Sequence, residues 1–388
     1  MRVRLDDPQR AAAWLAELAP AHVRTLDAYQ PGKPIEELER ELGISGAIKV
    51  ASNENPQGPS PRALAAIQAA LPSIHLYPDA AAFRLRKALA ERLGVAEHEV
   101  AVGAGSNDLL YQLVLALVGP EQDIVTPALG FLSYRLAAQV AGRTFVATAA
   151  TPRGPDIEAL CAAMTPRTRL VIVGTPNNPT GAVLTRADAD RVLAVLPEHA
   201  LLVLDEAYAE YAAAWPEVDH VDGLAFTRAA LAAGDPRVVL LRTFSKAYGL
   251  AAMRVGYAVA HGGVLDLLGR VVRTFHVGTL GQVAALAALD DGEHVLRSAA
   301  LGRRGLERIG AELARRGVTV YPSLANFCLV EAGRPSAPLY DRLLRRGVIV
   351  RPMGAWGLPT CLRVSIAGEA ELDRVIAALI DVVADDKA

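Results

Sequence analysis

Lys246 is the residue of this chain with the most distinctive chemistry. It follows a short apolar strand, residues 238–241, and it lies between Ser245 and a Tyr248-Gly249 turn, with Arg254 eight residues further on. A lysine amine forms a Schiff base with a carbonyl when its surroundings lower its pKa. Neighbouring hydroxyls and a guanidinium suit an aldehyde that also carries a phosphate. Taken alone, the stretch also fits a surface lysine after a buried strand.

Three further polar clusters follow apolar strands. The cluster at 103–107, GAGSN, opens a helix, where glycines allow backbone N–H groups to approach a phosphate. It lacks the G-x-G-x-x-G spacing of dinucleotide-binding proteins, and a plain turn with a helix cap is the alternative. The loop 175–181, TPNNPTG, holds Asn178 among prolines that restrict the backbone. Asp205 ends a buried strand, where a carboxylate needs a cationic ligand, a local ion pair or several donors.

Helical and strand patterns alternate through the middle of the chain. Helices are expected at 83–93, 108–118, 133–141, 156–164, 186–196 and 224–232. Strands are expected at 100–102, 123–125, 144–147, 170–173, 201–204, 238–241 and 256–259. Most of these strands are continuous apolar runs, which is typical of a mostly parallel sheet with helices on both faces. Ligands bind at the carboxyl ends of such strands, so the polar clusters are expected to form one site.

The remaining parts of the chain predict additional helices and a second unit. A capped helix near Asp6 or Asp7 begins the chain, and helices follow at 35–42 and 61–70. After residue 275 a smaller α+β unit is expected, with helices at 280–290, 293–316 and 369–383. Its strands are expected at 318–321, 327–330, 348–351 and 362–365. The helix at 293–316 would connect the two units.

Composition and charge exclude several classes of protein. The 388 residues are 52% apolar and 21% charged, enough to bury a sizeable core. The net charge is −2, and basic and acidic residues are interleaved along the chain, so the sequence predicts no basic surface for nucleic acid or an anionic membrane. No apolar run reaches the roughly 18 residues of a membrane span, and the acidic start is not a signal peptide. Cys161, Cys328 and Cys361 lack metal-ligand spacing and even pairing, which favours a reduced, cytoplasmic setting without a metal site.

Four stretches together resemble the fold type I aminotransferases that use pyridoxal phosphate (PLP), the aspartate aminotransferase superfamily. They are PNNPTG at 176–181, DEAY at 205–208, SK at 245–246 and RVG at 254–256. The stretches YQPGK at 29–33, ASNENP at 51–56 and LYPD at 76–79 are similar to the histidinol-phosphate aminotransferase branch, so the resemblance covers essentially the whole chain. It implies an α/β fold with a mostly parallel seven-stranded sheet in a large PLP-binding domain. The expected domains are 1–50 (an arm and part of the small domain), 51–278 (large) and 279–388 (small α+β).

The resemblance implies roles in cofactor binding for residues of the four stretches and for several residues outside them. Lys246 would hold PLP as a Schiff base and move a proton between the substrate Cα and C4′ of the cofactor. Asp205 would pair with the pyridine nitrogen and keep it protonated. Tyr208 and Asn178 would hydrogen-bond the phenolic oxygen, and Phe131 would stack on the ring. The residues expected to hold the cofactor phosphate are Ala104, Gly105, Ser106, Thr243, Ser245 and Arg254.

Residues elsewhere in the chain are implied to bind substrate or to complete the site. Arg363, in an apolar β run, would clamp the substrate carboxylate, whereas by itself it also fits a solvated edge residue. Asn326, Asn53 and Tyr29 would lie at the substrate pocket. Tyr77 would reach the cofactor phosphate of a neighbouring subunit, which implies a homodimer.

Three departures from the branch leave the amino donor open. They are FHVGTLGQ at 275–282, Asn107-Asp108 in place of Asp-Glu, and Phe131 in place of a tyrosine. Histidinol phosphate with 2-oxoglutarate is the first hypothesis, and phenylalanine is the second amino donor. A reaction like that of threonine-phosphate decarboxylases and a PLP-binding module without catalysis are the alternatives, the latter opposed by a complete set of site residues. His276 is either a substrate contact or a core histidine.

Overall fold

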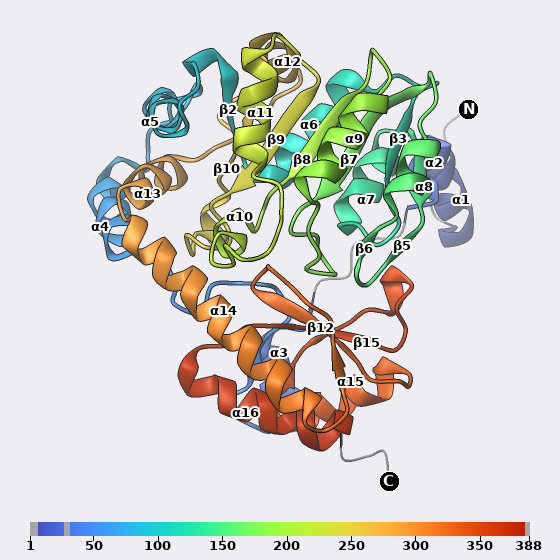
Figure 1. Cartoon of the computed structure of the whole chain (residues 1–388), viewed down its shortest axis with the longest axis vertical. Coiled ribbons are helices and arrows are strands. Elements are labelled where there is room, and N and C mark those ends of the chain that lie inside the picture. Colours follow the sequence, from blue (N-terminus) through green and yellow to red (C-terminus); the bar gives the residue numbers. More distant parts are fainter. Residues whose placement is uncertain (1–6, 27–31, 385–388) are drawn as a thin grey trace.

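The computed structural model describes residues 7–26 and 32–384, and a seven-stranded sheet forms its centre (Figure 1). The strand order is β2-β10-β9-β8-β7-β3-β4. The strands are β2 (Val100–Gly103), β3 (Asp123–Pro127), β4 (Thr144–Thr148), β7 (Thr168–Gly174), β8 (Leu201–Asp205), β9 (Val238–Thr243) and β10 (Gly256–Val259). Only β10 runs antiparallel to its neighbours, β9 and β2. The predicted mostly parallel sheet of seven strands is therefore confirmed.

Helices cover both faces of this sheet, which explains why its strands are apolar throughout. One face packs on α5 (Phe83–Leu93), α8 (Ile157–Ala162), α9 (Arg186–Val195) and α11 (Gly223–Ala232). The other face packs on α6 (Ser106–Leu117), α7 (Leu132–Val140) and α12 (Gly262–Gly269), of which α12 was not predicted. Within β7, Val171 and Val173 face the first group while Leu170 and Ile172 face the second. A short helix, α10 (Ala209–Ala212), and a hairpin of β5 (Ala150–Thr151) and β6 (Gly154–Pro155) lie outside the sheet.

The strand register brings the carboxyl ends of several strands to one edge. Gly174 at the end of β7 pairs with Asp205 at the end of β8. Gly256 at the start of β10 lies between Thr243 at the end of β9 and Gly103 at the end of β2. Because these strand ends are in register, the polar loops at them lie next to one another at this edge of the sheet, as the sequence predicts.

A smaller four-stranded sheet lies below the first in Figure 1. Its order is β11 (Thr319–Val320), β12 (Phe327–Glu331), β15 (Cys361–Ser365) and β14 (Arg351–Pro352), all antiparallel. Its core is closed by α14 (Gly292–Ala314), α15 (Ser336–Arg345) and α16 (Glu369–Leu379), of which α15 was not predicted. The last predicted helix extends past α16 only as a π-helical turn, Ile380–Ala384.

The single strand predicted at 348–351 is wrong, because this segment pairs with two different partners. Its first part, β13 (Val348–Ile349), pairs in parallel with β1 (Ile48–Lys49) near the N-terminus. Its continuation, β14, pairs with β15. The early segment of the chain thus joins the unit that the last third of the chain builds.

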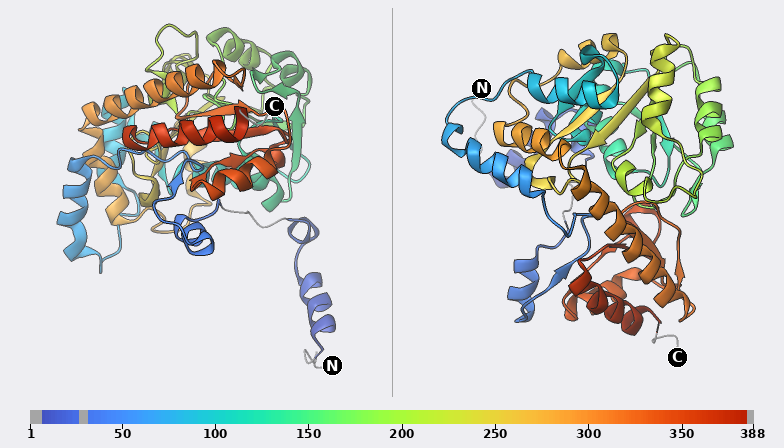
Figure 2. Two further views of the ribbon diagram at one scale, coloured as in Figure 1. Left: turned by 90° about the horizontal axis from the view of Figure 1, so that it is seen from below. Right: turned by 60° about the vertical axis from the view of Figure 1, so that its left-hand side comes forward.

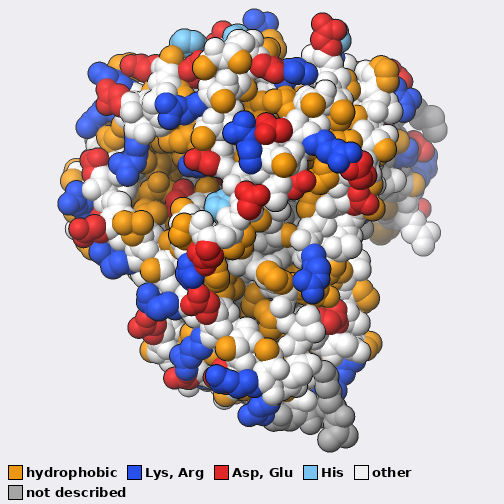
Figure 3. All heavy atoms as spheres, in the orientation of Figure 1, with side chains coloured by type: hydrophobic (Ala, Val, Ile, Leu, Met, Phe, Trp, Pro, Cys, Tyr) orange, Lys and Arg blue, Asp and Glu red, His pale blue; other side chains and the backbone are white. Residues whose placement is uncertain are grey.

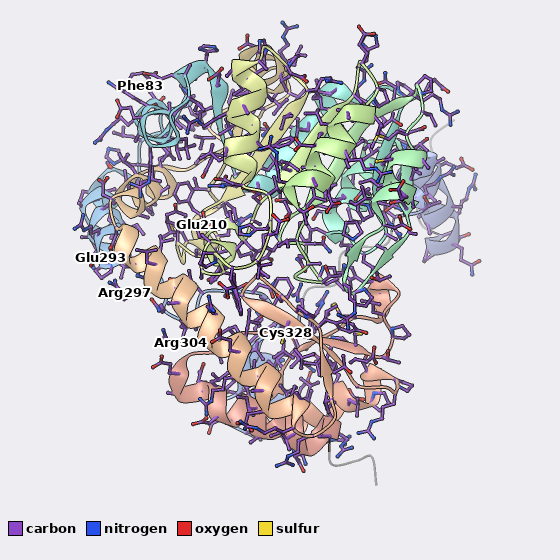
Figure 4. The ribbon with its side chains drawn as sticks, viewed as in Figure 1. Phe83, Glu210, Glu293, Arg297, Arg304 and Cys328 are labelled. Atoms are coloured by element: carbon purple, nitrogen blue, oxygen red, sulfur yellow. The ribbon has the colours of Figure 1, made fainter. Side chains whose placement is uncertain are left out.

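Helix α14 connects the two units, as predicted. Its first turns supply Ala299 to the cluster around Tyr208, and its last turns supply Ile309 and Leu313 to the core of the smaller sheet. Figure 4 shows Glu293, Arg297 and Arg304 along the outer side of this helix. Glu293 and Arg297 form an exposed ion pair of 3.6 Å, so the charged side faces water while the apolar side spans both cores.

Packing places the helix α13 (Thr279–Leu289) with the larger sheet. Ala284, Ala285 and Ala288 belong to the same core as Ala63 of α4 (Pro61–Ala70). We therefore propose that the larger domain ends between α13 and α14 rather than at residue 278.

The N-terminal helices contribute little to either core. Asp7 caps α1 (Pro8–Leu18) by accepting from Gln9 N at 2.9 Å, and α1 has no buried residue. Figure 2 shows α1 projecting from the body; α2 (Ala21–Arg24) follows it, and α3 (Ile35–Leu42) buries Leu38. On the face shown in Figure 3, positive and negative side chains are interspersed. Within residues 7–26 and 32–384, no helix has the length and apolarity to cross a membrane.

Candidate active site

A cavity of about 220 Å³ opens at the carboxyl edge of the seven-stranded sheet, and most of the predicted site residues line it. The predicted residues on its wall are Ser106, Phe131, Asn178, Asp205, Tyr208, Thr243, Ser245, Lys246 and Arg254. A second cavity of about 420 Å³ adjoins it and shares Lys246, Arg254 and Asn178 with it. Arg363 and Asn53 line this second cavity, which extends between the two sheets.

Lys246 lies in the loop after β9 with its amine directed at the first cavity. Its Nζ donates to the carbonyl of Ser52 at 3.3 Å and lies 5.8 Å from the centre of the Tyr208 ring. Burial lowers the pKa of Lys246 to about 8, and the positive charges of Arg363 and Arg254 add to this effect. A sizeable fraction of the amine is therefore neutral near pH 8, which is the form that attacks a carbonyl or takes up a proton.

Asp205 ends β8 and is 7% exposed, with its two carboxylate oxygens in different situations. Oδ2 accepts a hydrogen bond from the hydroxyl of Tyr134 at 2.9 Å. Oδ1 is buried and has no hydrogen-bond partner among the described residues. Burial raises the pKa of Asp205 to about 6, although the Tyr134 hydroxyl opposes the shift. A cationic N–H group in the cavity would satisfy Oδ1 and hold the carboxylate charged.

Arg254 and the hydroxyls of Thr243 and Ser245 form a polar corner of the cavity with one positive charge. Arg254 Nη1 donates to Ser245 Oγ at 3.2 Å, and Thr243 Oγ1 donates to Ser245 Oγ at 3.0 Å. A Cβ on Gly105, whose φ is +92°, would lie 2.7 Å from Arg254 Nη2. Only glycine therefore lets the guanidinium approach the start of α6, where it can face a phosphate together with the helix N-terminus.

Two of the three predicted backbone donors in this corner are already used within the chain. The N–H of Ala104 donates to Asp108 Oδ2 at 3.0 Å, and the N–H of Gly105 donates to the carbonyl of Gly103 at 2.7 Å. Ser106, the first residue of α6, lines the cavity. The structure thus favours Ser106 over Ala104 and Gly105 as the donor to an anion.

Arg363 is 6% exposed on β15 and faces the second cavity. Its Nη2 donates to the carbonyl of Ala51 at 2.6 Å, and its Nη1 donates to Asn178 Oδ1. The guanidinium lies 5.3 Å from the centre of the Phe327 ring. Arg363 is therefore a buried, oriented cation rather than the solvated edge residue that a lone arginine in a strand suggests. Its bond to Asn178 leaves the Asn178 N–H₂ group to face the cavity.

The two asparagines predicted at the substrate pocket are equally buried, but only Asn53 lines a cavity. Asn53 is 1% exposed, and its Nδ2 donates to the Tyr208 hydroxyl oxygen at 2.9 Å. Asn326 lines neither cavity, and its Nδ2 donates to the carbonyl of Asn53 at 3.0 Å. Asn326 thus supports the 53–54 backbone from behind, and its assignment as a substrate ligand stays a prediction.

Like Ala104, Gly105 and Asn326, the predicted residues Tyr77 and His276 line neither cavity. Tyr29 falls outside the described residues. Tyr77 is 81% exposed and stacks on Phe275 with ring centres 4.5 Å apart. One ring nitrogen of His276, Nε2, lies 3.0 Å from the carbonyl of Val102, which favours the structural interpretation of this histidine.

Sequence reasoning missed several residues on the cavity walls. Tyr134 gave no signal as the partner of Asp205, because the two are 71 positions apart and only the fold brings α7 over β8. Ser52 and Glu54 line the first cavity from the loop after β1. Arg351 and Trp356 line the second, and the Arg351 guanidinium lies 5.5 Å from the centre of the Trp356 ring.

Comparison with known proteins relates the whole chain to one family. A sequence model described as "Aminotransferase class I and II" matches residues 45–379. "Histidinol-phosphate aminotransferase 2" of Methylococcus capsulatus is 44% identical over 372 residues, which cover 94% of this chain and 98% of that protein. "Histidinol-phosphate aminotransferase 1" of Nitrosococcus oceani is 43% identical over 363 residues, covering 94% and 96%.

Solved structures share the fold along nearly its whole length. The histidinol-phosphate aminotransferase from Sinorhizobium meliloti in complex with pyridoxal-5'-phosphate superposes with a TM-score of 0.83 at 31% identity, covering 94% of this chain and 96% of that one. The aspartate aminotransferase from Thermus thermophilus with maleate superposes with a TM-score of 0.80 at 24% identity, covering 94% and 99%. The second likeness concerns the fold alone.

The lowered pKa of Lys246 predicts a pH-dependent cost to folding in the ligand-free protein. Below pH about 8 the amine is charged in both folded and unfolded states, so the folded state bears the cost of burying the charge. Above pH about 10.5 it is neutral in both states and the cost is gone. We expect Lys246→Met to raise the free energy of unfolding at pH 7 by on the order of 1–2 kcal/mol, after allowance for partial hydration.

Urea unfolding of both proteins between pH 7 and 10.5 measures this difference. The gain from Lys246→Met should decline as the pH rises through this window. A gain that stays constant from pH 7 to 10.5 would show that the folded lysine has an ordinary pKa.

Proposed function

Since the chain belongs to the class I and II aminotransferases, enzymes that use pyridoxal phosphate, we propose that it moves an amino group from histidinol phosphate to 2-oxoglutarate by a ping-pong reaction. The observation that carries the proposal is the pairing of a buried lysine of lowered pKa with a buried carboxylate whose Oδ1 has no partner among the described residues. The printed names of the relatives supply the amino donor. A cytoplasmic role in histidine biosynthesis is part of the same proposal.

The residues of the first cavity fit the cofactor. Asp205 Oδ1 would accept a hydrogen bond from the protonated pyridine nitrogen, which supplies the partner that this oxygen lacks. The hydroxyls of Ser106, Thr243 and Ser245 and the guanidinium of Arg254 would hold the phosphate. PLP supplies an aldehyde for the amine and a cationic ring that withdraws electrons from the substrate Cα.

The remaining cavity residues would direct a proton during the reaction. The neutral Nζ of Lys246 would take the proton from the substrate Cα and deliver it to C4′ of the cofactor. Tyr208 and Asn178 would donate to the phenolic oxygen of the cofactor. Phe131 lines the cavity and lies edge-on to Tyr134, with ring centres 5.9 Å apart, and it would stack on the cofactor ring.

The second cavity supports a phosphorylated amino donor. Arg254, Arg351 and Arg363 all line it, so it presents guanidinium groups from both sheets to one ligand. A phosphate ester carries up to two negative charges and several acceptor oxygens, which suits more than one arginine. The aromatic and aliphatic lining formed by Tyr111, Leu132 and Trp356 favours phenylalanine as the second candidate.

The exposed apolar side chains around Tyr77 support a homodimer. Ile74, Leu76 and Tyr77 are 62%, 61% and 81% exposed, and Phe275 is 42% exposed beside them. Figure 4 shows Phe83 on the outer side of α5 in the same region of the fold. Contiguous apolar side chains of this size are usually covered by a partner. We propose that a second copy covers them and that each Tyr77 reaches the partner's cofactor phosphate.

The central test of the proposal is a panel of amino donors with 2-oxoglutarate. Histidinol phosphate should give the highest kcat/KM, phenylalanine a lower one, and no donor should release CO₂. We expect Lys246→Ala to lower turnover by at least 10³-fold, as for removal of a general base and nucleophile, while PLP still binds. Transamination by Lys246→Ala at the wild-type rate would refute the assigned role of the lysine.

Arg351 should distinguish the two amino donors. Loss of a charge-assisted hydrogen bond costs about 1.5–3 kcal/mol, so Arg351→Ala should lower kcat/KM for histidinol phosphate about 10- to 100-fold. For phenylalanine the change should stay within about threefold, because this donor has no phosphate to pair with the guanidinium. Single-turnover rates of the first half-reaction, measured with each donor, give the loss for histidinol phosphate and the loss for phenylalanine. Arg308→Ala, which removes an exposed arginine paired with Asp373, is the control. Equal losses for both donors would refute a phosphate contact.

Mixing two inactive variants tests the contribution of Tyr77 across the dimer. In a heterodimer of Lys246→Ala and Tyr77→Ala subunits, one site is intact only if Tyr77 comes from the partner. Random mixing should then restore about a quarter of the wild-type specific activity, since half of the dimers carry one working site of two. Lys246→Ala mixed with Asp205→Ala, two substitutions in the same subunit's site, should restore none. No recovery in the first mixture would refute the cross-subunit role.

A further inference from the structure

Asn53 lies at the centre of a buried hydrogen-bond chain between Tyr208 and the smaller sheet. Its Nδ2 donates to the Tyr208 hydroxyl oxygen at 2.9 Å, and its Oδ1 accepts from Ser365 Oγ at 2.7 Å. Its backbone N–H donates to the same Ser365 oxygen at 2.9 Å. Asn53, Ser365 and Tyr208 are each 3% exposed or less, so water does not compete for these bonds.

The backbone of Asn53 is bent to make these contacts. Its φ of +55° is in the left-handed region, which asparagine tolerates better than most residues. Asn326 Nδ2 donates to the Asn53 carbonyl at 3.0 Å and holds the turn in place. The side chain and the main chain of Asn53 are thus fixed by Ser365 of β15 and by Asn326 in the loop before β12.

The hydrogen bonds of Asn53 determine which way the phenolic proton of Tyr208 points. Asn53 donates to the hydroxyl oxygen, so that oxygen acts as an acceptor on this side. The O–H of Tyr208 donates to no described residue, and Tyr208 lines the first cavity. Burial raises the pKa of Tyr208 to about 12, so the phenol keeps its proton at neutral pH. The proton is therefore available to an acceptor in the cavity.

Ser365 determines the orientation of the Asn53 amide. A hydroxyl that donates to Oδ1 turns the Nδ2 side of the amide toward Tyr208. With the amide reversed, Oδ1 would accept the phenolic proton and withdraw it from the cavity. Ser365 lies two positions after Arg363 on β15, and the side chains of a strand repeat with period two, so both face the same side.

We propose that Ser365 and Asn53 are positioning residues, which keep the Tyr208 proton directed at the cofactor's phenolic oxygen and tie it to the strand that carries Arg363. This inference rests on the proposed function, because it needs PLP in the first cavity and Tyr208 beside its phenolic oxygen. The inference gives a role to Ser365, which lines neither cavity. It also gives Asn53, which lines the second cavity, the additional role of orienting Tyr208.

Substitution of Ser365 alters none of the charged groups that act on Tyr208 and Lys246. They are Asp205 from β8, Arg254 from the loop after β9, Arg363 from β15 and Glu54 from the loop after β1. A change on substitution of Ser365 therefore reports the Tyr208 hydrogen bond rather than a lost charge.

A spectrophotometric pH titration of the PLP-loaded protein tests the proposal. The visible absorption of the lysine-bound cofactor changes with its protonation, and a hydrogen bond to the phenolic oxygen stabilises the deprotonated form. Tyr208→Phe should therefore raise the apparent pKa of the bound cofactor by about one unit or more. Ser365→Ala should raise it by about half as much, and Ser365→Thr, which keeps the hydroxyl, should return it toward the wild-type value.

Two comparisons separate a positioning role from a general structural one. Ser323→Ala removes another buried serine hydroxyl, which bonds to the backbone of Phe327 and not to Asn53, and should leave the titration unchanged. In a Tyr208→Phe background, Ser365→Ala should add no further shift, because its effect acts through the tyrosine. Asn53→Asp, whose carboxylate would accept the phenolic proton of Tyr208, should shift the titration in the same direction as Tyr208→Phe and serves if Ser365→Ala does not fold. Because this carboxylate also adds a charge, only the part of its shift that disappears in the Tyr208→Phe background reports the hydrogen bond.

Each remaining result overturns a defined part of the inference. If Ser365→Ala and Asn53→Asp titrate like the wild type while Tyr208→Phe shifts, the positioning role is refuted and the proposed function stands. If Ser365→Ala shifts the titration equally with and without Tyr208, the serine does not act through the tyrosine. If Tyr208→Phe itself causes no shift, the role assigned to Tyr208 under the proposed function fails, and the inference fails with it.

Discussion

The carboxylate of Asp205 is buried at the end of β8, and one of its oxygens has no hydrogen-bond partner among the described residues. A buried charge without a partner is costly, and such a residue is tolerated only where a ligand or a bound proton compensates it. The rest of the site is arranged around this constraint. Tyr134 satisfies the other oxygen and fixes the carboxylate rotamer. Lys246 approaches from the next strand, so the cavity has a cation on one side and an acceptor on the other.

The antiparallel strand β10 explains how Lys246 and Arg254, eight positions apart in one loop, both reach the cavity that Asp205 lines. The chain leaves the sheet after Thr243, passes Lys246 and returns at Gly256, which pairs directly with Thr243. Arg254, just before the return, adopts a left-handed conformation with φ +51° and folds back over Ser245. A parallel strand in this place would begin at the opposite edge of the sheet, so its connection would lead away from the cavity. The one reversed strand in the sheet is thus what places the lysine and the anion-binding guanidinium at the same edge.

Much of this arrangement could be predicted from the sequence, because strands that end in polar clusters are local signals. Lys246, Asp205 and Arg254 follow or begin apolar strands, and the motif order then assigned them to one site. The contacts of Tyr134 and Ser365 could not be predicted, since they join residues far apart in the chain. The use of the Ala104 N–H by Asp108 depends on the rotamer of one side chain. Residues 348–351 are divided between two sheets because β1 pairs with one part and β15 with the other. The hydrophobic periodicity of the segment does not show which strand each part will pair with.

The pairing of β1 with β13 has a consequence for synthesis on the ribosome. Ile48 is made early, whereas its partner Val348 lies 300 positions further along the chain. The 51–55 loop that continues from β1, with Asn53 and its bonds to β15, must wait equally long for its contacts. The seven-stranded sheet can assemble first as the chain emerges, since its strands lie between residues 100 and 259. The site can therefore be completed only after β13 and β15 have emerged.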